Sequence, residues 1–262
     1  MQQVRFAENL RLAKLGDAAA QFSVALTLHD DSDACGIAMI QSTSDRWAIK
    51  AKKQGCKAAE GYCALYGLGE PTDCVRGLQL LELEGEAGHL GVQCLLGCFF
   101  HFGRRSVDIA VDFKKAAHWY QLAAAQGNPT AQCHLGVLYA NGSGVLQDAR
   151  EAVKLYRLAA NQGYVDAQFN LALCFFKGVG VLQDYQEAVK WFRLAADQGN
   201  ADAQYNLGVC HAKGHGVPRN IPEAEKWFVL AAEQEHLGAL CAIAPYVQPN
   251  GRFKYADHFE TS

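Results

Sequence analysis

The sequence has no long hydrophobic run, no excess of positive charge and no apolar leader at its start. The longest apolar run, residues 94–100, ends at His101 and falls well short of the ~18 residues that a membrane helix needs. Residues 1–8 lack the apolar core of a signal peptide. The formal net charge of −3 gives no electrostatic footprint for nucleic acid. We therefore expect a cytoplasmic protein that neither inserts into membranes nor binds nucleic acid.

Motifs of catalysis are missing as well. The chain has no nucleophile elbow, no Walker loop and no His-Glu-x-x-His. A Gly-x-Gly-Val element is present, but it follows a helical pattern rather than a strand and recurs three times, which marks it as architecture. Histidines such as His118 and His215 are scattered along the chain. We expect neither enzymatic activity nor a cofactor.

What the sequence does contain is a repeat. Three consecutive segments, 131–166, 167–202 and 203–238, align without a gap at a period of about 36 residues. Each begins with Ala-Gln, has Gly-x-Gly-Val in its middle and ends with Ala-Ala-x-Gln. With 50% hydrophobic residues, the chain has ample material for the core that stacked repeats share.

The same unit extends upstream in weaker form, and the last residues depart from it. Segment 92–130 keeps the motif with a longer middle loop, while two earlier segments are decayed copies. The predicted organisation is a cap helix over 2–16, repeats over 20–57, 58–91, 92–130, 131–166, 167–202 and 203–238, the start of a cap over 239–244, and a tail over 245–262. This predicts an all-α fold, a right-handed α/α superhelix in which residues 1–244 form one solenoid of about six helix-turn-helix repeats.

Each unit has the signals of two helices. Apolar residues recur at helical spacing on both sides of the glycines, which break the helix. We expect reciprocal capping boxes to open the second helices, at Asp148-x-x-Glu151, Asp184-x-x-Glu187 and Asn220-x-x-Glu223. Left-handed glycines are expected to close them, at Gly127, Gly163 and Gly199.

On these residues the chain resembles the Sel1-like repeat (SLR) family, relatives of the tetratricopeptide repeats. The motif Ala-Gln-x-Asn-Leu-Gly, Gly-x-Gly-Val, Glu-Ala-x-x-Trp, Ala-Ala-x-Gln-Gly matches closely over 131–238 and less well over 20–130. It departs from the family at four sites: Glu235 at the terminal glycine, Ala172 at the helix-one glycine, His211 at the tyrosine and Leu155 at the tryptophan. The resemblance implies an adaptor that holds proteins or peptides together, and it carries no catalytic residues.

The resemblance also indicates which face binds a partner. By analogy with tetratricopeptide repeats, the first helices line a concave face, and the third, seventh and tenth sites of each unit point outward. These sites and the lysines at the rim give the candidate residues Cys94, Cys98, His101, Val137, Phe169, Leu173, Phe176, Lys177, Tyr205, Val209 and Lys213. Phe169, Phe176 and Tyr205 would form an exposed apolar stripe of the kind that marks an interface. The alternative is that some of these side chains complete the core between repeats.

The cysteines allow more than one interpretation. Cys94, Cys98 and His101 lie at i, i+4 and i+7 on one predicted helix, with Cys133 and His134 on the next first helix, which suits a metal site. The short Cys-x-x-Cys spacing of common zinc sites is absent, and cysteine is a good small filler for a helix seam. We favour the structural interpretation and expect no metal.

Disulfides are the second interpretation of the cysteines. A cysteine-rich branch of the resembled family links the two helices of a unit, which needs a cysteine on each helix. Here most cysteines fall on first helices without a partner on the second, so we expect them to be reduced, as in the cytosol. Cys35, Cys56 and Cys74 are expected in divergent loops, and their redox state is left open.

The sequence thus favours a scaffold that binds a partner protein or peptide on its concave face. Two alternatives remain: a cysteine-dependent redox or metal-handling assembly factor, and a hydrolase with an unrecognised site. The tail 245–262 holds Tyr246, Phe253, Tyr255 and Phe259 and is expected to fold back over the last unit, to lie in a neighbour's groove, or to be a frayed terminus.

Overall fold

The computed structural model describes residues 2–35 and 38–243, with side chains described over 8–26 and 44–243. Regular structure in these residues is helical, apart from one isolated bridge between Arg104 and Ile109. The prediction of an all-α fold of repeated helices is therefore confirmed. The expectations for the tail 245–262 and for the thiol of Cys35 lie outside what the structure describes. Among the described helices, none has the length and apolar character to cross a membrane.

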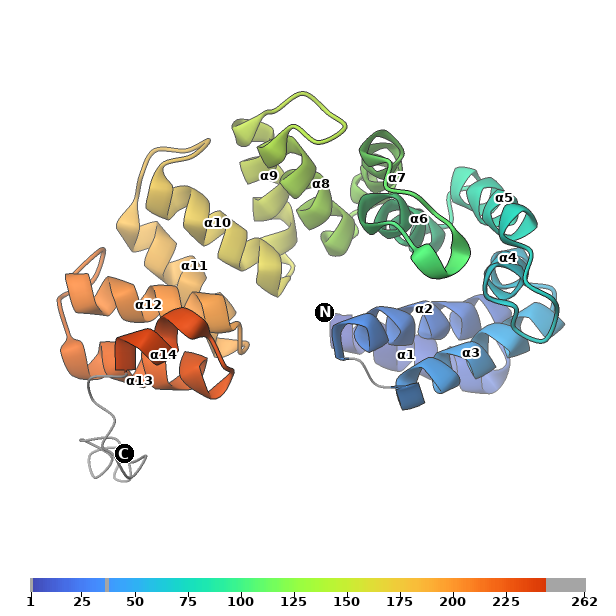
Figure 1. Ribbon diagram of the computed structural model, residues 1–262, viewed down its shortest axis with the longest axis horizontal. Helices are drawn as coiled ribbons and strands as arrows, with labels where there is room; N and C mark the ends of the chain where they lie inside the picture. The colour runs from blue at the N-terminus through green and yellow to red at the C-terminus, as the bar shows by residue number, and fades with distance from the viewer. Residues whose placement is uncertain (1, 36–37, 244–262) are drawn as a thin grey trace. The chain divides into compact units, whose positions relative to one another are not determined.

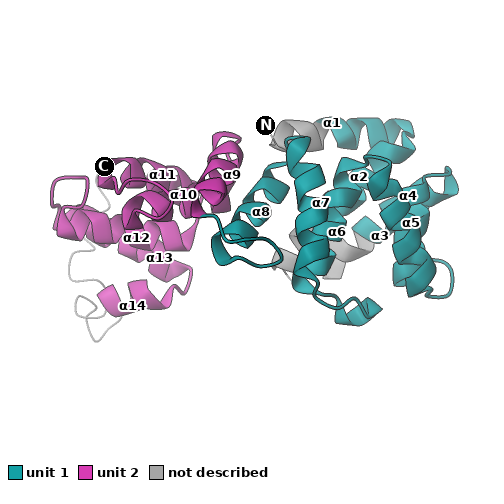
Figure 2. Ribbon diagram, turned by 90° about the horizontal axis from the view of Figure 1, so that it is seen from above, with its two compact units in different colours: residues 1–148 teal, residues 149–262 magenta. Residues whose placement is uncertain are grey.

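The chain divides after Asp148 into two compact units (Figure 2). The helices of unit 1 are α1 (Gln2–Leu15), α2 (Ala18–Cys35), α3 (Ala38–Lys53), α4 (Lys57–Tyr66), α5 (Cys74–Glu86), α6 (Leu90–Phe102), the 3₁₀ turn η1 (Arg105–Val107), α7 (Phe113–Ala125) and α8 (Pro129–Asn141). Those of unit 2 are α9 (Ala149–Asn161), α10 (Val165–Lys177), α11 (Tyr185–Asp197), α12 (Ala201–Lys213), α13 (Ile221–Glu233) and α14 (Leu237–Ile243). The prediction of one continuous array over 1–244 stays a prediction.

Within each unit, consecutive helices pack as hairpins (Figure 1). In unit 1, α2 packs on α3, α4 on α5 and α6 on α7; in unit 2, α10 packs on α11 and α12 on α13. We call the leading member of each pair a first helix and the other a second helix. Each second helix also packs on the next first helix, as α11 does on α12, so a hairpin buries its faces only between neighbours.

The N-caps of α11 and α13 are where predicted, but the reciprocal half of these two capping boxes is wrong. Asp184 accepts bonds from the amides of Gln186 and Glu187 (2.9 and 3.0 Å), as an N-cap should. The carboxylate of Glu187 does not return to Asp184, because it pairs with Lys190. The amide of Asp184 instead donates to the carbonyl of Phe175 at 3.0 Å. The cap therefore ties the start of α11 to the last turn of α10.

The predicted left-handed glycines are confirmed. Gly127, Gly163 and Gly199 have φ of +85°, +88° and +89°. At the corresponding position after α13 stands Glu235, which holds φ of +61°. A side chain in this conformation is strained, so the last repeat retains the family turn at a cost in stability.

The second glycine of Gly-x-Gly-Val has a packing reason. A Cβ added to Gly180 would lie 2.2 Å from the carbonyl oxygen of Ala149, at the start of α9. Gly216 meets Tyr185 and Gly144 meets Phe113 in the same way, each at 2.2 Å. The loop between two helices therefore rests on the start of the preceding second helix, and only glycine fits there.

The glutamine of the Ala-Gln pair ties three helices together, a role that the sequence did not predict. Gln168 on α10 is buried, and its Nε2 donates to the carbonyl of Ala160 on α9 at 3.4 Å. Its Oε1 accepts from Nε2 of Gln198, after α11, at 2.8 Å. The same bonds recur for Gln204 with Ala196 and Gln234, and for Gln93 with Gly85 and Gln126. The buried amide is thus satisfied from both sides.

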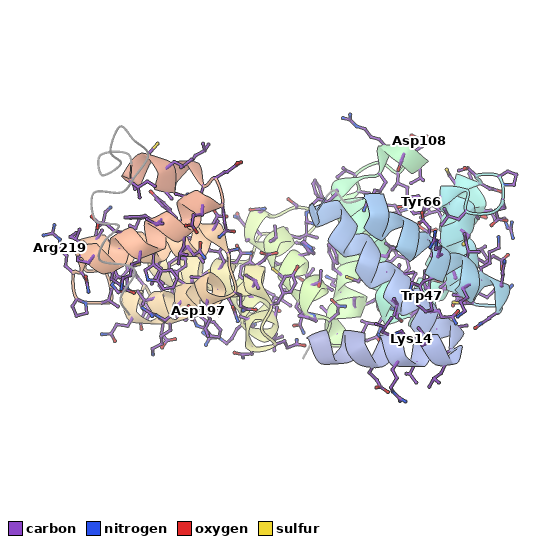
Figure 3. All side chains as sticks on the ribbon, turned by 90° about the horizontal axis from the view of Figure 1, so that it is seen from below. Lys14, Trp47, Tyr66, Asp108, Asp197 and Arg219 are labelled. Carbon is purple, nitrogen blue, oxygen red and sulfur yellow. The ribbon has the colours of Figure 1, made fainter. Side chains whose placement is uncertain are left out.

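The longer loop after α6 forms a 3₁₀ turn that is closed by backbone hydrogen bonds. Arg104 and Ile109 exchange backbone bonds at 2.7 and 3.0 Å around η1, and Val107 is buried beneath them. Asp108, labelled in Figure 3, turns the chain with φ of +55°. The extra residues of this repeat therefore form an ordered turn.

Candidate protein-binding face

The first helices of unit 2 bury one face and leave the other for solvent. On α10, Ala167, Leu171, Ala172 and Phe175 are buried, at the spacing of one helical stripe. Their equivalents on α12 are Ala203, Leu207, Gly208 and His211. The residues between these stripes form the outer surface, and most of the predicted partner-binding residues lie there.

The aromatic residues predicted on α10 are half-buried, which corrects the expectation of an exposed stripe. The ring of Phe169 lies 6.0 Å from that of Phe192 on α11. Phe176 lies 5.2 Å from Tyr185 and 5.8 Å from His215. Both rings close the seam between helices, so the interpretation that some of these residues complete the core is partly right.

Tyr205 on α12 has a similar position. Its ring lies 5.6 Å from Phe228 on α13 and stacks on His236 at 4.7 Å. Leu173 and Val209 are half-buried like these aromatic residues, whereas Lys177 and Lys213 are exposed.

Two acidic residues, missed by the sequence prediction, complete this surface. Asp166 and Asp202 are exposed in the first turns of α10 and α12, one residue before the motif alanine. Partial desolvation, and then the charge of Asp202 at the equivalent position of the next repeat, raise the pKa of Asp166. His236 Nε2 lies 3.1 Å from Oδ1 of Asp202. The signal in the sequence was the recurrence of Asp at one motif position.

The lysines of this surface differ from those of the second helices. Lys190 and Lys226 on α11 and α13 each pair with a glutamate three residues earlier. Within the described part of the chain, Lys177 and Lys213 have no carboxylate at ion-pair distance. Their charges are therefore available to a binding partner. We call Asp166, Leu173 and Lys177 of α10 with Asp202, Val209 and Lys213 of α12 the first-helix face of unit 2.

In unit 1, three of the predicted residues pack against neighbouring side chains, whereas Val137 on α8 is half-buried as Leu173 and Val209 are. Cys94 is only 8% exposed, and its thiol donates to Oδ1 of Asn128 at 3.8 Å, so its prediction as a surface residue is wrong. Cys98 accepts from the hydroxyl of Tyr120 at 3.4 Å. His101 Nδ1 lies 3.4 Å from the same hydroxyl.

Two histidines and a tyrosine form the centre of this cluster. His134 stacks on Tyr120 at 5.3 Å, and its ring meets that of His101 edge-on at 5.6 Å. Burial, with a smaller contribution from His101, lowers the pKa of His134 to about 4. Burial also lowers the pKa of His101. Both rings are therefore neutral near pH 7 and act as packing groups.

The cysteine and histidine residues do not converge on a metal site in the side chains that the structure describes. Cys133 and Cys210 are almost fully buried, in the manner of small core fillers. All nine cysteines with described side chains are free, Cys56 and Cys74 among them. Burial raises the pKa of Cys174 and Cys210 to about 11, which keeps these thiols protonated and poorly reactive at neutral pH.

Comparison with known proteins agrees with the helical repeat. The family model described as Sel1 repeat matches five times in succession, over residues 57–89, 92–128, 129–164, 165–200 and 201–236. These matches cover more than half of the chain, and those over 57–89, 92–128, 165–200 and 201–236 each span one of the hairpins described above. No protein of curated function matches the chain in sequence.

Solved structures with similar folds carry the same description. A protective antigen of uropathogenic Escherichia coli with an SLR fold is 26% identical over 92% of this chain, with a TM-score of 0.69. The chain spans 51% of that protein's length. A Sel1 repeat protein from Oxalobacter formigenes is 25% identical, with a TM-score of 0.68, covering 86% of this chain and 88% of its own.

Proposed function

Because the chain belongs to the Sel1 repeat family, whose members generally mediate protein–protein interactions, we propose that it is a scaffold that binds a partner protein or peptide on the outer surface of its first helices. The observation that carries this proposal is the first-helix face of unit 2. There Leu173 and Val209 are half-buried at equivalent positions, between two acidic residues and two exposed lysines, and the lysines make no ion pair in the described part of the chain. A partly exposed apolar strip with polar borders is typical of a binding surface.

The family is generally non-catalytic, and we propose no reaction for this chain. The hydrolase alternative needs a nucleophile beside a general base. Cys98 lies near His101, but both are hydrogen-bonded to Tyr120 in a packed aromatic cluster. The arrangement supports a structural role for these residues.

The redox alternative is also less well supported. A reactive cysteine needs a lowered pKa and access to solvent. Burial instead raises the pKa of Cys63 to about 11, as it does for Cys174 and Cys210. We propose that the thiols are reduced fillers of helix seams and that the protein is cytoplasmic. Thiol titration of the denatured, unreduced chain should find all ten cysteines reactive.

The scaffold proposal is tested by affinity capture from a lysate of the source cells. Leu173→Asp plus Val209→Asp should abolish capture of the partner, because charge replaces the apolar strip. The matched control is Leu194→Asp plus Leu230→Asp, at the exposed leucines of α11 and α13. Equal capture by both double variants and the wild type would contradict the proposed face, provided that circular dichroism shows all three folded.

A further inference from the structure

On each first helix of unit 2, an acid, an aliphatic residue and a base lie along one line. Asp166, Leu173 and Lys177 are spaced by seven and four residues on α10. Eleven residues make close to three helical turns, so Lys177 lies within about 20° of Asp166 around the axis and about 16 Å along it. Asp202, Val209 and Lys213 repeat this spacing on α12.

The two lines lie side by side with like charges together. At the acidic end, Asp166 and Asp202 stand at equivalent positions in the first turns of α10 and α12, and His236 Nε2 lies 3.1 Å from Asp202. Partial desolvation and then the charge of Asp202 raise the pKa of Asp166. At the basic end, Phe176 beside Lys177 has its ring 5.8 Å from that of His215, two residues after Lys213. The surface therefore has an acidic edge, an aliphatic middle and a basic edge.

Helix stability explains only part of this pattern. An acid in the first turn and a base in the last turn favour any helix through its dipole. The dipole does not require these residues to share a line with a half-buried aliphatic side chain. On the neighbouring second helices, Glu187 and Glu223 pair with lysines of their own helix, whereas Lys177 and Lys213 make no ion pair in the described part of the chain.

We propose, on the basis of the scaffold function above, that this face binds an amphipathic helix of the partner, antiparallel to α10 and α12. The partner helix carries acidic residues in its first turn, against Lys177 and Lys213. It carries basic residues about eleven positions later, against Asp166 and Asp202. Its apolar side chains, at i, i+3 or i+4 and i+7, cover Leu173 and Val209.

The direction follows from electrostatics. A helix with ordinary charge distribution is acidic at its start and basic at its end. Laid antiparallel on α10 and α12, it brings opposite charges together at both edges, whereas parallel docking brings like charges together. The acidic edge also repels phosphate, which disfavours nucleic acid on this face.

The probes are two synthetic peptides of sixteen residues with capped ends and the same apolar stripe. One has two glutamates in its first turn and two lysines in its last turn, and the other has these charges exchanged. Titrated at low salt into the full-length chain, the acid-first peptide should bind at least tenfold more tightly than the base-first peptide. Equal affinity of the two peptides, or binding of neither, would overturn the proposal.

Charge-reversal variants test the edges. Lys177→Glu plus Lys213→Glu should weaken the binding of the acid-first peptide at least tenfold. Further exchange of Asp166→Lys plus Asp202→Lys should make the chain prefer the base-first peptide. Lys190→Glu plus Lys226→Glu on the second helices is the matched control and should leave both affinities unchanged. Circular dichroism identifies a variant that fails to fold, and Lys177→Gln plus Lys213→Gln then replaces it, with a smaller loss of affinity in the same direction.

A spin label on the peptide measures the direction in which it docks. A spin label on the N-terminus of the acid-first peptide should broaden the amide signals near Lys177 and Lys213, and those near Asp166 and Asp202 would broaden if docking were parallel. Failure of both peptides, with capture still lost in Leu173→Asp plus Val209→Asp, would reject the helical partner and leave the scaffold function standing. Capture insensitive to Leu173 and Val209 would instead reject the scaffold face itself.

Discussion

The first helices of the two units use one repeat to present different chemistry. At the site of Asp166 and Asp202, unit 2 has carboxylates where unit 1 has Thr130 on α8. At the middle of the helix, unit 2 has Asn170 and Asn206 where α8 has His134, which is packed against aromatic rings. The framework of glycines and glutamines is common to both, so the difference lies in the side chains that the first helices place outside this framework.

The comparison distinguishes first-helix residues that pack against their neighbours from those that are available to a partner. In unit 1, Cys98, His101 and Tyr120 satisfy each other, and desolvation favours neutral rings. In unit 2, the lysines of the first-helix face are exposed. We infer that the outer residues of unit 1 mainly stabilise the repeat, whereas those of unit 2 are available to a partner. The following predictions test this division, from the largest effect to the smallest.

Substitution of the second glycine of Gly-x-Gly-Val should strongly destabilise the repeat. Gly180→Val forces a branched side chain into φ of +72° and against a carbonyl that lies 2.2 Å from the added Cβ. We expect a loss of about 3–4 kcal/mol in the free energy of unfolding, measured by urea denaturation. Gly199→Ala, with nothing within 4 Å of its Cβ, should lose only about 1 kcal/mol. Similar losses for both variants would contradict the packing argument.

Unit 1 should be acid-sensitive through His134. Its folded pKa of about 4 lies below the ordinary value, so the unfolded chain binds more protons between about pH 6.5 and pH 4. The stabilisation is complete above pH 6.5 and is lost as the pH falls through this window, by about 2–3 kcal/mol. His134→Asn, the residue of unit 2, should reduce this loss in urea titrations at several pH values. The exposed His118→Asn is the control, and equal acid profiles for wild type and His134→Asn would refute the assignment.

Removal of a buried glutamine should destabilise the repeat to an intermediate extent. In Gln204→Leu, the carbonyl of Ala196 and the side-chain amide of Gln234 lose the hydrogen bonds that they make with Gln204. We expect the free energy of unfolding to fall by about 1–2 kcal/mol. Urea denaturation measures the loss. The exposed Gln186→Leu on α11 is the control and should change stability by less than about 0.5 kcal/mol. An unchanged stability of Gln204→Leu would show that the hydrogen bonds of the buried glutamine are dispensable.

The smallest effect is a gain in stability. Glu235→Gly relieves the strained positive φ after α13 and should stabilise unit 2 by about 1 kcal/mol in thermal or urea denaturation. Glu233→Gly, in the last turn of α13, is the opposite control and should destabilise by about 1 kcal/mol. A destabilised Glu235→Gly would mean that the glutamate makes a compensating interaction.

The sequence predicts the repeat framework well because it is encoded locally. The caps of Asp184 and Asn220 and the left-handed Gly163 and Gly199 follow from spacing within one unit. The partner of Glu187 was predicted wrongly because the amide of Asp184 is satisfied by Phe175, a contact between helices that spacing does not encode.

The candidate site is less predictable, for the same physical reason. Cys94 and Phe169 occupy one motif position, yet Cys94 is buried near Asn128 while Phe169 is half-buried against Phe192. Accessibility depends on the size of side chains on neighbouring helices. The acidic edge was missed because Asp166 and Asp202 lie outside the positions taken by analogy, and the influence of one carboxylate on the other depends on how neighbouring repeats stack.

The central claim is that the first helices of unit 2 bind the partner. Hydrogen exchange of the full-length chain, with and without the captured partner, tests it most directly. We predict slower exchange on binding in residues 165–177 and 201–213, with little change in α11 and α13. Protection confined to α11 and α13, or to the helices of unit 1, would contradict the account.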